Sequence, residues 1–233
     1  MAGGLARGLF AAASALILAT ACANSPTRVF DEIPTQIDPQ QNYVIYLHGL
    51  WVELHGPNAF NDRFGVRYQL DAITEKLAKS GLTVIAQVRP RATRTTNFAQ
   101  TVASQVRTLI GRGATAGRIT VVGHSKGGLI ALLAASMVGL KDVRYVILAG
   151  CGKRGSRFRR GFTQFLSGRA IGAAGDVLSL YDVADHTAGT CREIFERSDF
   201  TGDELILDTR RGHGLFYTPE TVWLEPVVRW ATR

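Results

Sequence analysis

The sequence lacks the features that would indicate several common protein classes. It contains no internal repeat and no long low-complexity linker, so the part of the 233-residue chain after its N-terminal segment is expected to form one folded domain. Aromatic residues make up only 9% of the chain, and no nucleic-acid-binding motif is present. The formal net charge of +8 therefore does not point to a nucleic-acid partner.

The N-terminal segment is too short to be a transmembrane helix. Its apolar run, Leu9 to Ala21, falls short of the roughly 20 residues that a membrane span requires. A basic residue precedes this run, which predicts a secretory signal peptide over residues 1–22. The sequence Ala-Thr-Ala-Cys that ends at Cys22 resembles a bacterial lipobox, in which the cysteine would carry a lipid. We expect export to the periplasm or anchoring in a membrane through Cys22, with ordinary signal cleavage as the alternative.

Cysteine is scarce, with three residues in the chain. If Cys22 carries a lipid, only Cys151 and Cys191 remain. Each of these follows a predicted strand at the same edge of the sheet, so the two could form a disulfide in an oxidising compartment. Two separate free thiols are the alternative, because sequence alone cannot show that two cysteines meet.

Strand and helix patterns alternate through the predicted domain, which covers residues 42–233. Apolar runs predict strands at 43–47, 83–88, 118–122, 143–149, 177–181 and 203–208, and helical periodicity predicts helices at 66–80, 97–111, 126–138 and 217–230. This alternation favours an α/β fold, with a doubly wound, mostly parallel sheet of about six strands flanked by helices. The preceding residues 23–41 are largely polar and contain three prolines, so they are predicted to be a tether.

Residues 119–128 are Ile-Thr-Val-Val-Gly-His-Ser-Lys-Gly-Gly, the most informative stretch of the chain. Four β-branched residues predict a buried strand, and an Ala- and Leu-rich run after the turn predicts a helix. Gly123 and Gly127 lack a Cβ atom, so the strand and the helix can approach closely around Ser125. This context is typical of a Gly-x-Ser-x-Gly nucleophile elbow and predicts Ser125 as a nucleophile. A glycine-rich helix start without chemistry is the alternative.

A serine nucleophile needs a general base, and the base needs an acid that orients it. Only two histidines follow Ser125, His186 and His213. His213 lies in a Gly-His-Gly loop just after the last predicted strand, and this setting favours it as the base. The acid is expected past the end of the preceding strand, where Asp182 and Asp185 both lie.

Together with the pair His48-Gly49 after the first predicted strand, these residues make the chain resemble the α/β-hydrolase family over residues 40–232. In that family the acid lies a few residues beyond its strand, which implies Asp185 as the acid. Asp182 is then expected to cap the following turn. The usual first antiparallel strands of the family are hard to find, so the resemblance implies a reduced version of the fold.

The resemblance also implies two backbone donors for the negative charge that develops on the carbonyl oxygen during acyl transfer. The expected donors are the N–H groups of Leu50 and Lys126, with Trp51 next in line after Leu50. His48 is expected to shape this loop, and the side chain of Lys126 is expected to point to solvent.

Residues 151–172 contain six basic residues and no acidic residue. The segment lies between two predicted strands, where α/β-hydrolases often insert a lid, so we expect a short lid here. Its apolar residues recur at helical spacing: Phe158, Phe162, Phe165 and Leu166. A basic amphipathic helix suits an anionic membrane surface or an acyl substrate with an acidic head group. The alternative is a solvated basic face whose phenylalanines pack on the core. Three arginines after another strand could add to the same positive field: Arg89, Arg91 and Arg94.

The resemblance implies a serine hydrolase that cleaves carboxylic esters, lipid or acyl esters among them, through an acyl-enzyme. Ser125 would attack the acyl carbon, His213 would transfer the proton, and Asp185 would orient His213. The same residues serve thioesterases and amidases, and a non-catalytic envelope protein could bind a ligand on the same fold, so these alternatives stay open. No metal or organic cofactor is implied. The expected partners are a small-molecule or lipid ester and a membrane surface.

Overall fold

The computed structural model describes residue 1 and residues 28–233, so Cys22 and nearly all of the predicted signal peptide lie outside the described residues. A central sheet of seven strands has the order β1-β5-β2-β6-β7-β8-β9, and every neighbouring pair in it is parallel. The strands are β1 (Val29–Phe30), β2 (Tyr43–Leu47), β5 (Thr83–Ile85), β6 (Ile119–His124), β7 (Arg144–Leu148), β8 (Ala174–Asp182) and β9 (Asp199–Leu207). A separate antiparallel hairpin consists of β3 (Phe60–Asn61) and β4 (Val66–Arg67). The predicted parallel α/β fold is confirmed, with one strand more than the predicted six.

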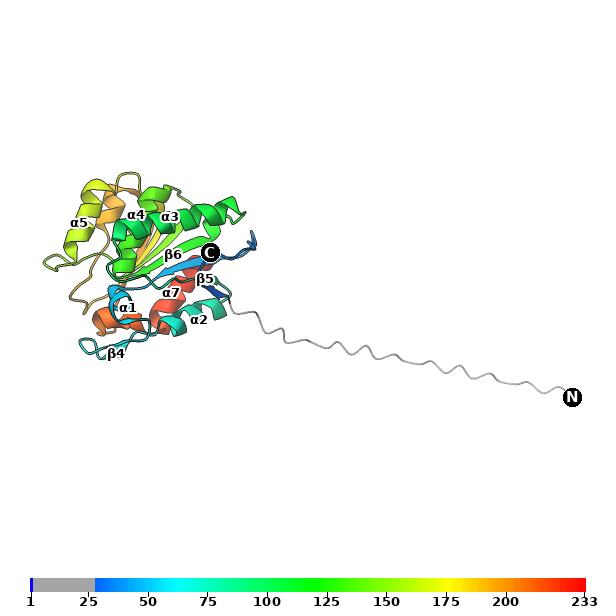
Figure 1. Ribbon diagram of the computed structural model, residues 1–233, viewed down its shortest axis with the longest axis horizontal. Helices are drawn as coiled ribbons and strands as arrows, with labels where there is room; N and C mark the ends of the chain where they lie inside the picture. Colours follow the sequence, from blue (N-terminus) through cyan, green and yellow to red (C-terminus); the bar gives the residue numbers. More distant parts are fainter. Residues whose placement is uncertain (2–27) are drawn as a thin grey trace.

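Helices cover both faces of this sheet (Figure 1). The helices are α1 (Leu50–His55), α2 (Leu70–Lys79), α3 (Thr95–Gly111), α4 (Lys126–Val138), α5 (Arg159–Gly168), α6 (Glu193–Arg197) and α7 (Thr221–Thr232), and two short 3-10 helices cover Ala116–Arg118 and Gly212–Tyr217. Helices α3, α4 and α5 lie on one side of the sheet in Figure 1, and α1, α2 and α7 lie on the other. Among the described residues, we find no helix with the length and apolar character that a membrane crossing needs.

Two hydrophobic cores fill the spaces between the sheet and its two helical layers. Successive side chains of a strand point to opposite faces, and β2 shows this clearly. Tyr43, Ile45 and Leu47 belong to the core under α3 and α4, whereas Val44 and Tyr46 belong to the core under α2 and α7. Because every residue of β2 is buried, the strand reads as a continuous apolar run instead of an alternating one.

The tether predicted for residues 23–41 is wrong for its described part, residues 28–41. Strand β1 pairs in parallel with β5 and forms the edge of the sheet. Ile33 and Ile37 pack against the core on the α3 and α4 side, and Thr115 donates a hydrogen bond to the carbonyl oxygen of Pro39. The apolar residues spaced among the prolines therefore attach this segment to the domain.

The predicted lid segment places its apolar stripe inward. Phe162 and Phe165, both on α5, are 0% and 1% exposed and belong to the same core as α4. Leu166 is buried beside them, whereas Phe158 lies just before the helix and is 38% exposed. The stripe is therefore used for packing, which favours the core-packing alternative over a face that docks on a membrane.

Candidate active site

Ser125 occupies a strained turn between β6 and α4, with φ at 55° and ψ at −115°. A non-glycine residue in this left-handed region is uncommon, and such strain often occurs at functional sites. The flanking glycines are required sterically. A Cβ atom on Gly123 would lie 2.3 Å from the carbonyl oxygen of Gly127, and a Cβ atom on Gly127 would lie 2.1 Å from that of Leu47. The close approach expected from the sequence is therefore present.

The structure brings Ser125, His213 and Asp185 together in one chain of hydrogen bonds. His213 Nδ1 lies 2.7 Å from Asp185 Oδ2, and His213 Nε2 lies 2.9 Å from Ser125 Oγ. An ionised carboxylate only accepts hydrogen bonds, so Nδ1 carries the proton and Nε2 is free to accept from the serine hydroxyl. These positions meet the geometric requirement for a nucleophile, a base and an orienting acid. His186 is exposed and makes none of these contacts.

Asp185 is ionised in this setting, although it is buried. Burial by itself would raise its pKa, but the hydrogen bond and the charge of His213, with the N–H groups of Ala188 and Thr187, lower the pKa of Asp185 to about 2. Thr187 also donates from Oγ1 to Asp185 Oδ1 at 2.8 Å, and its Oγ1 lies 2.9 Å from His213 Nδ1. Sequence reasoning did not single out Thr187. A threonine two residues after an aspartate is a frequent turn partner, and that signal could have found it.

Asp182 caps the turn after its strand, which is the role expected for the aspartate that is not the acid. Its carboxylate accepts hydrogen bonds from the N–H of Ala184, from the N–H and Oγ1 of Thr209, and from the N–H of Gly212. Burial opposes its ionisation, but these donors together lower the pKa of Asp182. The residue thus caps the turn after β8 and fastens the loop that carries His213.

The two predicted oxyanion donors are the first residues of two helices beside the nucleophile. Leu50 begins α1 and Lys126 begins α4, and the first N–H groups of a helix have no partner inside it. Leu50 lines a cavity with Ser125, His213 and Lys126, and Trp51 lines a neighbouring one. The placement agrees with the predicted role, which stays a prediction.

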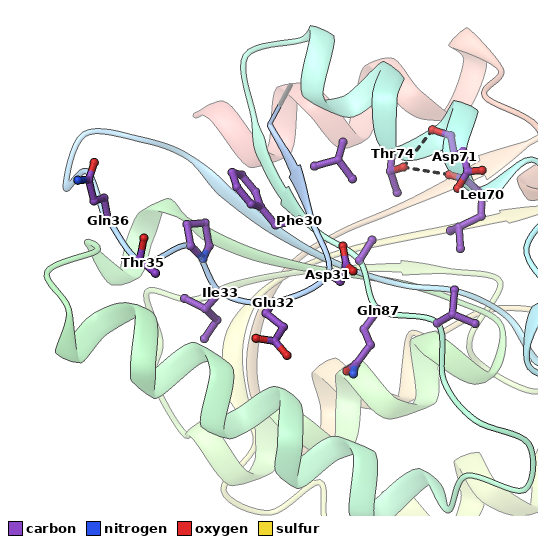
Figure 2. Close-up of a pocket in the computed structure, with 14 residues that line it drawn as sticks. Phe30, Asp31, Glu32, Ile33, Thr35, Gln36, Leu70, Asp71, Thr74 and Gln87 are labelled. Carbon is purple, nitrogen blue, oxygen red and sulfur yellow. Dashed lines mark hydrogen bonds between the residues drawn. The ribbon is translucent and has the colours of Figure 1, made fainter. Parts of the chain in front are cut away.

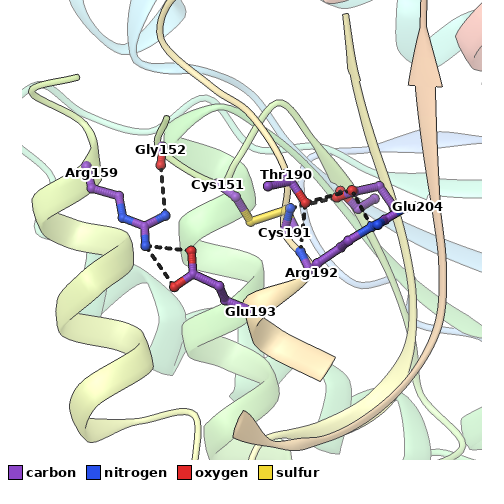
Figure 3. Close-up of a disulfide and its surroundings, with 9 residues drawn as sticks. Cys151, Gly152, Arg159, Thr190, Cys191, Arg192, Glu193 and Glu204 are labelled. Carbon is purple, nitrogen blue, oxygen red and sulfur yellow. Dashed lines mark hydrogen bonds and ion pairs between the residues drawn. A yellow bond between two sulfur atoms is a disulfide. The ribbon is translucent and has the colours of Figure 1, made fainter. Parts of the chain in front are cut away.

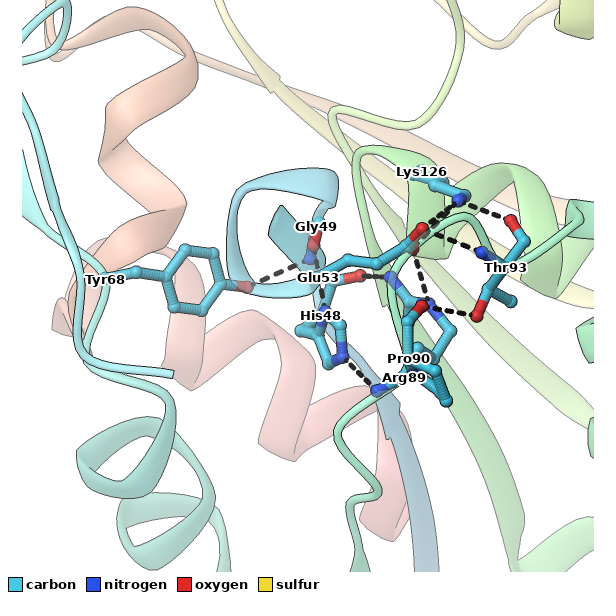
Figure 4. A network of polar contacts seen from close by, with 8 residues as sticks. All are labelled: His48, Gly49, Glu53, Tyr68, Arg89, Pro90, Thr93 and Lys126. Atoms are coloured by element: carbon cyan, nitrogen blue, oxygen red, sulfur yellow. Dashed lines mark hydrogen bonds and ion pairs between the residues drawn. The ribbon is translucent and has the colours of Figure 1, made fainter. Parts of the chain in front are cut away.

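The side chain of Lys126 does not point to solvent, so that expectation is wrong. Its ammonium group lies 2.7 and 2.8 Å from the two carboxylate oxygens of Glu53, and it donates to the carbonyl oxygen of Thr93 at 2.6 Å (Figure 4). Glu53 is only 4% exposed and needs a cation beside it. A buried carboxylate one turn along α1 therefore draws Lys126 inward.

Arg89 joins the same polar network and does not contribute to an exposed positive field, so that expectation is wrong as well. It is 1% exposed, its Nε lies 3.4 Å from Glu53 Oε2, and its N–H donates to His48 Nε2 at 2.9 Å. Burial and the charge of Arg89 lower the pKa of His48 to about 3, so this histidine is neutral. His48 Nδ1 also lies 2.8 Å from the carbonyl oxygen of Gly49, which agrees with the expectation that His48 shapes this loop.

A disulfide joins Cys151 and Cys191, which the sequence had left as either paired or free (Figure 3). The bond connects the start of the lid segment to the loop that follows Asp185. A bridge between Gly152 and Ala188 and an ion pair of 2.6 Å between Arg159 and Glu193 reinforce this connection. The lid segment and the acid-bearing loop are thus one crosslinked unit.

Two small cavities meet at Ser125 and His213, and Leu50, Phe158 and Thr187 line both of them. The narrow cavity, of about 130 Å³, is completed by Lys126, Leu129, Ala149, Gly150, Gly152 and Ala188. The wide cavity, of about 190 Å³, is completed by Gly49, Trp51, Leu54, Asn61, Arg63, Phe64, His124, Arg157 and Tyr217. A larger open groove of about 1170 Å³ lies along β1 and α2, and no predicted site residue lines it (Figure 2).

A second buried histidine lies behind the serine and was not anticipated from the sequence as part of the site. The rings of His124 and His213 are 5.0 Å apart between centroids, and the hydroxyl of Tyr68 lies 3.2 Å from His124 Nδ1. Burial lowers the pKa of His124 well below its ordinary value, so it stays neutral beside His213. Within the part of the chain that the structure describes, no group of His, Cys, Asp and Glu is arranged to hold a metal ion.

Comparison with known proteins agrees with this fold. The sequence profile of the lipase (class 3) family matches residues 17–145. A lipase-esterase related protein from Clostridium acetobutylicum superimposes with a TM-score of 0.55 at 13% identity, over 84% of this chain and 97% of that one. A monoacylglycerol lipase from Paleococcus ferrophilus gives 0.54 at 17% identity, over 84% and 96%. Acetyl xylan esterase 1 from a Thermoanaerobacterium species gives 0.53 at 15% identity, over 85% and 75%. A search of curated protein sequences gave no match.

Proposed function

The chain belongs to the lipase (class 3) family and is a hydrolase of the lipase and esterase type, and on that premise we propose that it cleaves carboxylic esters through an acyl-enzyme on Ser125. The observation that carries the proposal is the hydrogen-bonded chain from Ser125 Oγ through His213 to Asp185, at 2.9 and 2.7 Å. Ser125 and His213 line two cavities, which could hold the two halves of an ester.

The geometry supports the following sequence of bond changes. Ser125 Oγ attacks the acyl carbon while its proton passes to His213 Nε2, and Asp185 stabilises the resulting imidazolium. The N–H groups of Leu50 and Lys126 hold the negative oxygen of the tetrahedral intermediate. His213 then donates the proton to the departing alkoxide, which leaves as the alcohol and produces the acyl-enzyme. Water repeats the cycle, with its proton taken by His213, and releases the acid.

The size of the cavities favours compact esters. Their volumes, about 130 and 190 Å³, are both below the roughly 300–1,000 Å³ that is usual for pockets that enclose a drug-sized ligand. We therefore expect short acyl chains to be preferred over long lipid chains. A series of 4-nitrophenyl esters from two to twelve carbons checks this, with kcat/KM expected to be highest at two to six carbons. A maximum at ten or twelve carbons would contradict it.

Covalent labelling of the serine tests the mechanism. Intact-mass spectrometry after reaction with a fluorophosphonate should show one adduct on the wild type and none on Ser125→Ala. His213→Ala should abolish both labelling and ester hydrolysis. A well-folded protein that takes no adduct would instead support a non-catalytic binding role. Thioester and anilide substrates with the same acyl group then show whether esters are the preferred class.

Export and lipidation rest on the sequence alone. The apolar run before Cys22 and its lipobox-like ending support a protein anchored outside the cytoplasm. Because the apolar stripe of α5 is buried, we assign any membrane association to this anchor. Cys22→Ala should move the protein from the membrane fraction to the soluble fraction, and unchanged fractionation would remove the proposal.

A further inference from the structure

Two arginines from different segments of the chain line the wide cavity. Arg63 comes from the turn between β3 and β4, and Arg157 comes from the lid segment just before Phe158. Each guanidinium rests over the ring of the phenylalanine that follows it, at 5.5 Å for Arg63 and 4.9 Å for Arg157. Both phenylalanines, Phe64 and Phe158, also line the cavity, so the two cations are positioned at its boundary.

Neither guanidinium is engaged by another polar group of the described residues. Both residues are exposed, and no hydrogen bond or ion pair of either side chain is found there. One other arginine of each segment is paired. Arg67, on the same hairpin, donates to the carbonyl oxygen of Asn58 at 2.6 Å. Arg159, in the same lid segment, holds both carboxylate oxygens of Glu193. The two cavity arginines thus keep their hydrogen-bond donors available.

The cavity walls supply no anion to balance these charges. Among the described residues that line the wide and narrow cavities there is no aspartate or glutamate. Two carboxylates of the candidate site, Asp185 and Glu53, are buried and already hold His213 and Lys126. An uncompensated positive potential in a concave site raises the local concentration of anions.

We propose that the preferred substrates are esters that carry an anionic group, a carboxylate or a phosphate, in the half of the molecule that fills the wide cavity. The anion would lie between Arg63 and Arg157, since guanidinium forks match the planar oxygens of such groups. The narrow cavity, bordered by Leu129, Ala149 and Gly150, takes the smaller, uncharged half. This inference rests on the proposed ester hydrolysis and specifies its substrate class.

Matched pairs of esters measure the preference. Mono-4-nitrophenyl glutarate and its neutral methyl ester place the charge in the acyl half, and 4-acetoxybenzoate and its methyl ester place it in the alcohol half. A third pair, dihexanoyl phosphatidic acid and dihexanoylglycerol, presents the charge as a lipid headgroup. We expect kcat/KM for the anionic member to exceed that of the neutral member about tenfold in one of the pairs, and the pair that responds identifies the source of the anion. Equal values in all three pairs would overturn the proposal.

Charge removal and salt supply the controls. Arg63→Gln and Arg157→Gln should each lower the ratio of kcat/KM between the anionic and the neutral ester about three- to tenfold. Arg160→Gln, which removes an exposed arginine of α5 that lines neither cavity, should leave the ratio unchanged. Higher ionic strength should also reduce the ratio, because salt screens partly exposed charges. If all three substitutions lowered the ratio equally, the preference for anionic esters would come from net charge, and the proposed site between Arg63 and Arg157 would be wrong.

A binding experiment keeps this inference separate from the proposed chemistry. In Ser125→Ala, which cannot form an acyl-enzyme, monomethyl glutarate should bind by calorimetry, and the further change Arg63→Gln or Arg157→Gln should weaken binding. A wild-type protein that binds the anion but turns over no ester would contradict only the acyl-enzyme mechanism. Turnover of neutral esters without anion binding would contradict only the anionic substrate class.

Discussion

The carboxylate of Glu53 holds the ammonium group of Lys126 at 2.7 and 2.8 Å, and Lys126 is itself one of the two predicted oxyanion donors. Glu53 lies one helical turn after Leu50, the other predicted donor, on α1. The ion pair therefore connects the two helix starts whose N–H groups are predicted to bind one oxygen atom. The side chains of Glu53 and Lys126 are 1% and 17% exposed, so the contact is largely shielded from water.

Breaking this pair should affect both stability and the chemical step. Glu53→Gln leaves Lys126 and Arg89 without their counter-charge, and removing one partner of a buried pair typically costs about 3–5 kcal/mol in the free energy of unfolding. We expect kcat to fall at least about tenfold with a smaller change in KM, because the donors act mainly on the transition state. Denaturant unfolding and steady-state kinetics measure the two effects.

An exposed ion pair provides the control for Glu53. Glu75 and Lys79 lie 3.5 Å apart on α2 with side chains 55% and 75% exposed. Glu75→Gln should change the free energy of unfolding by less than about 1 kcal/mol and leave kcat unchanged. The double variant Glu53→Gln/Lys126→Met should be more stable than Glu53→Gln alone, because it removes the unpaired charge of Lys126. If Glu53→Gln were as mild as Glu75→Gln, the supporting role would be wrong.

Thr187 should help to orient the catalytic groups. Thr187→Val removes the hydroxyl that donates to Asp185 Oδ1 at 2.8 Å but keeps the shape of the side chain. A hydrogen bond to a charged group is worth about 1.5–3 kcal/mol, so we expect kcat to fall roughly tenfold or more with KM nearly constant. Thr187→Ser keeps the hydroxyl and should retain most activity. Equal loss in the serine and valine variants would show that packing, and not the hydrogen bond, is what matters.

Stability should decrease at acid pH through Asp185. Its pKa is lowered to about 2 in the folded protein, while an unfolded aspartate titrates near about 3.9. The ionised form therefore stabilises the fold above about pH 4, and this contribution, on the order of 2 kcal/mol, is lost as the pH falls from about 4 through 2. The free energy of unfolding of Asp185→Asn, measured against denaturant from pH 2 to 7, should be lower at neutral pH and depend less on acid. Parallel pH curves for the two proteins would contradict this.

The crosslink between the lid segment and the acid-bearing loop should contribute substantially to stability. Cys151 and Cys191 are 40 residues apart, and a loop of that length corresponds to about 4 kcal/mol in the chain-entropy description. Replacing both cysteines by serine should lower the Tm by about 8–16 °C for a domain of this size. Dithiothreitol should lower the Tm of the wild type similarly and have no effect on the double variant. A Tm unaffected by both treatments would show that the loops are held without the bond.

The local pattern of residues determined most of the elements and predicted the nucleophile. A short, continuous apolar run is typical of a buried parallel strand. Two of the central predictions, the strand at 43–47 and the helix at 126–138, agree with β2 and α4 residue for residue. The turn at Ser125 was readable because two glycines without Cβ are the chemical condition for the close approach. The helix predicted from residue 66 begins at Leu70, since residues 60–67 form a hairpin that carries no strong period.

Contacts between distant residues were decided by the tertiary structure. Asp182 ends β8 and Asp185 follows it. Only the register of β8 and β9 with the loop at His213 brings Asp185 into contact with His213 and turns Asp182 toward Thr209. The lysine after the serine turned inward because Glu53, 73 positions earlier, is buried beside it. Such contacts depend on strand order and side-chain packing, which no local pattern encodes. The sequence by itself thus determined which candidate residues the chain offers, and the fold decided which of them lie together.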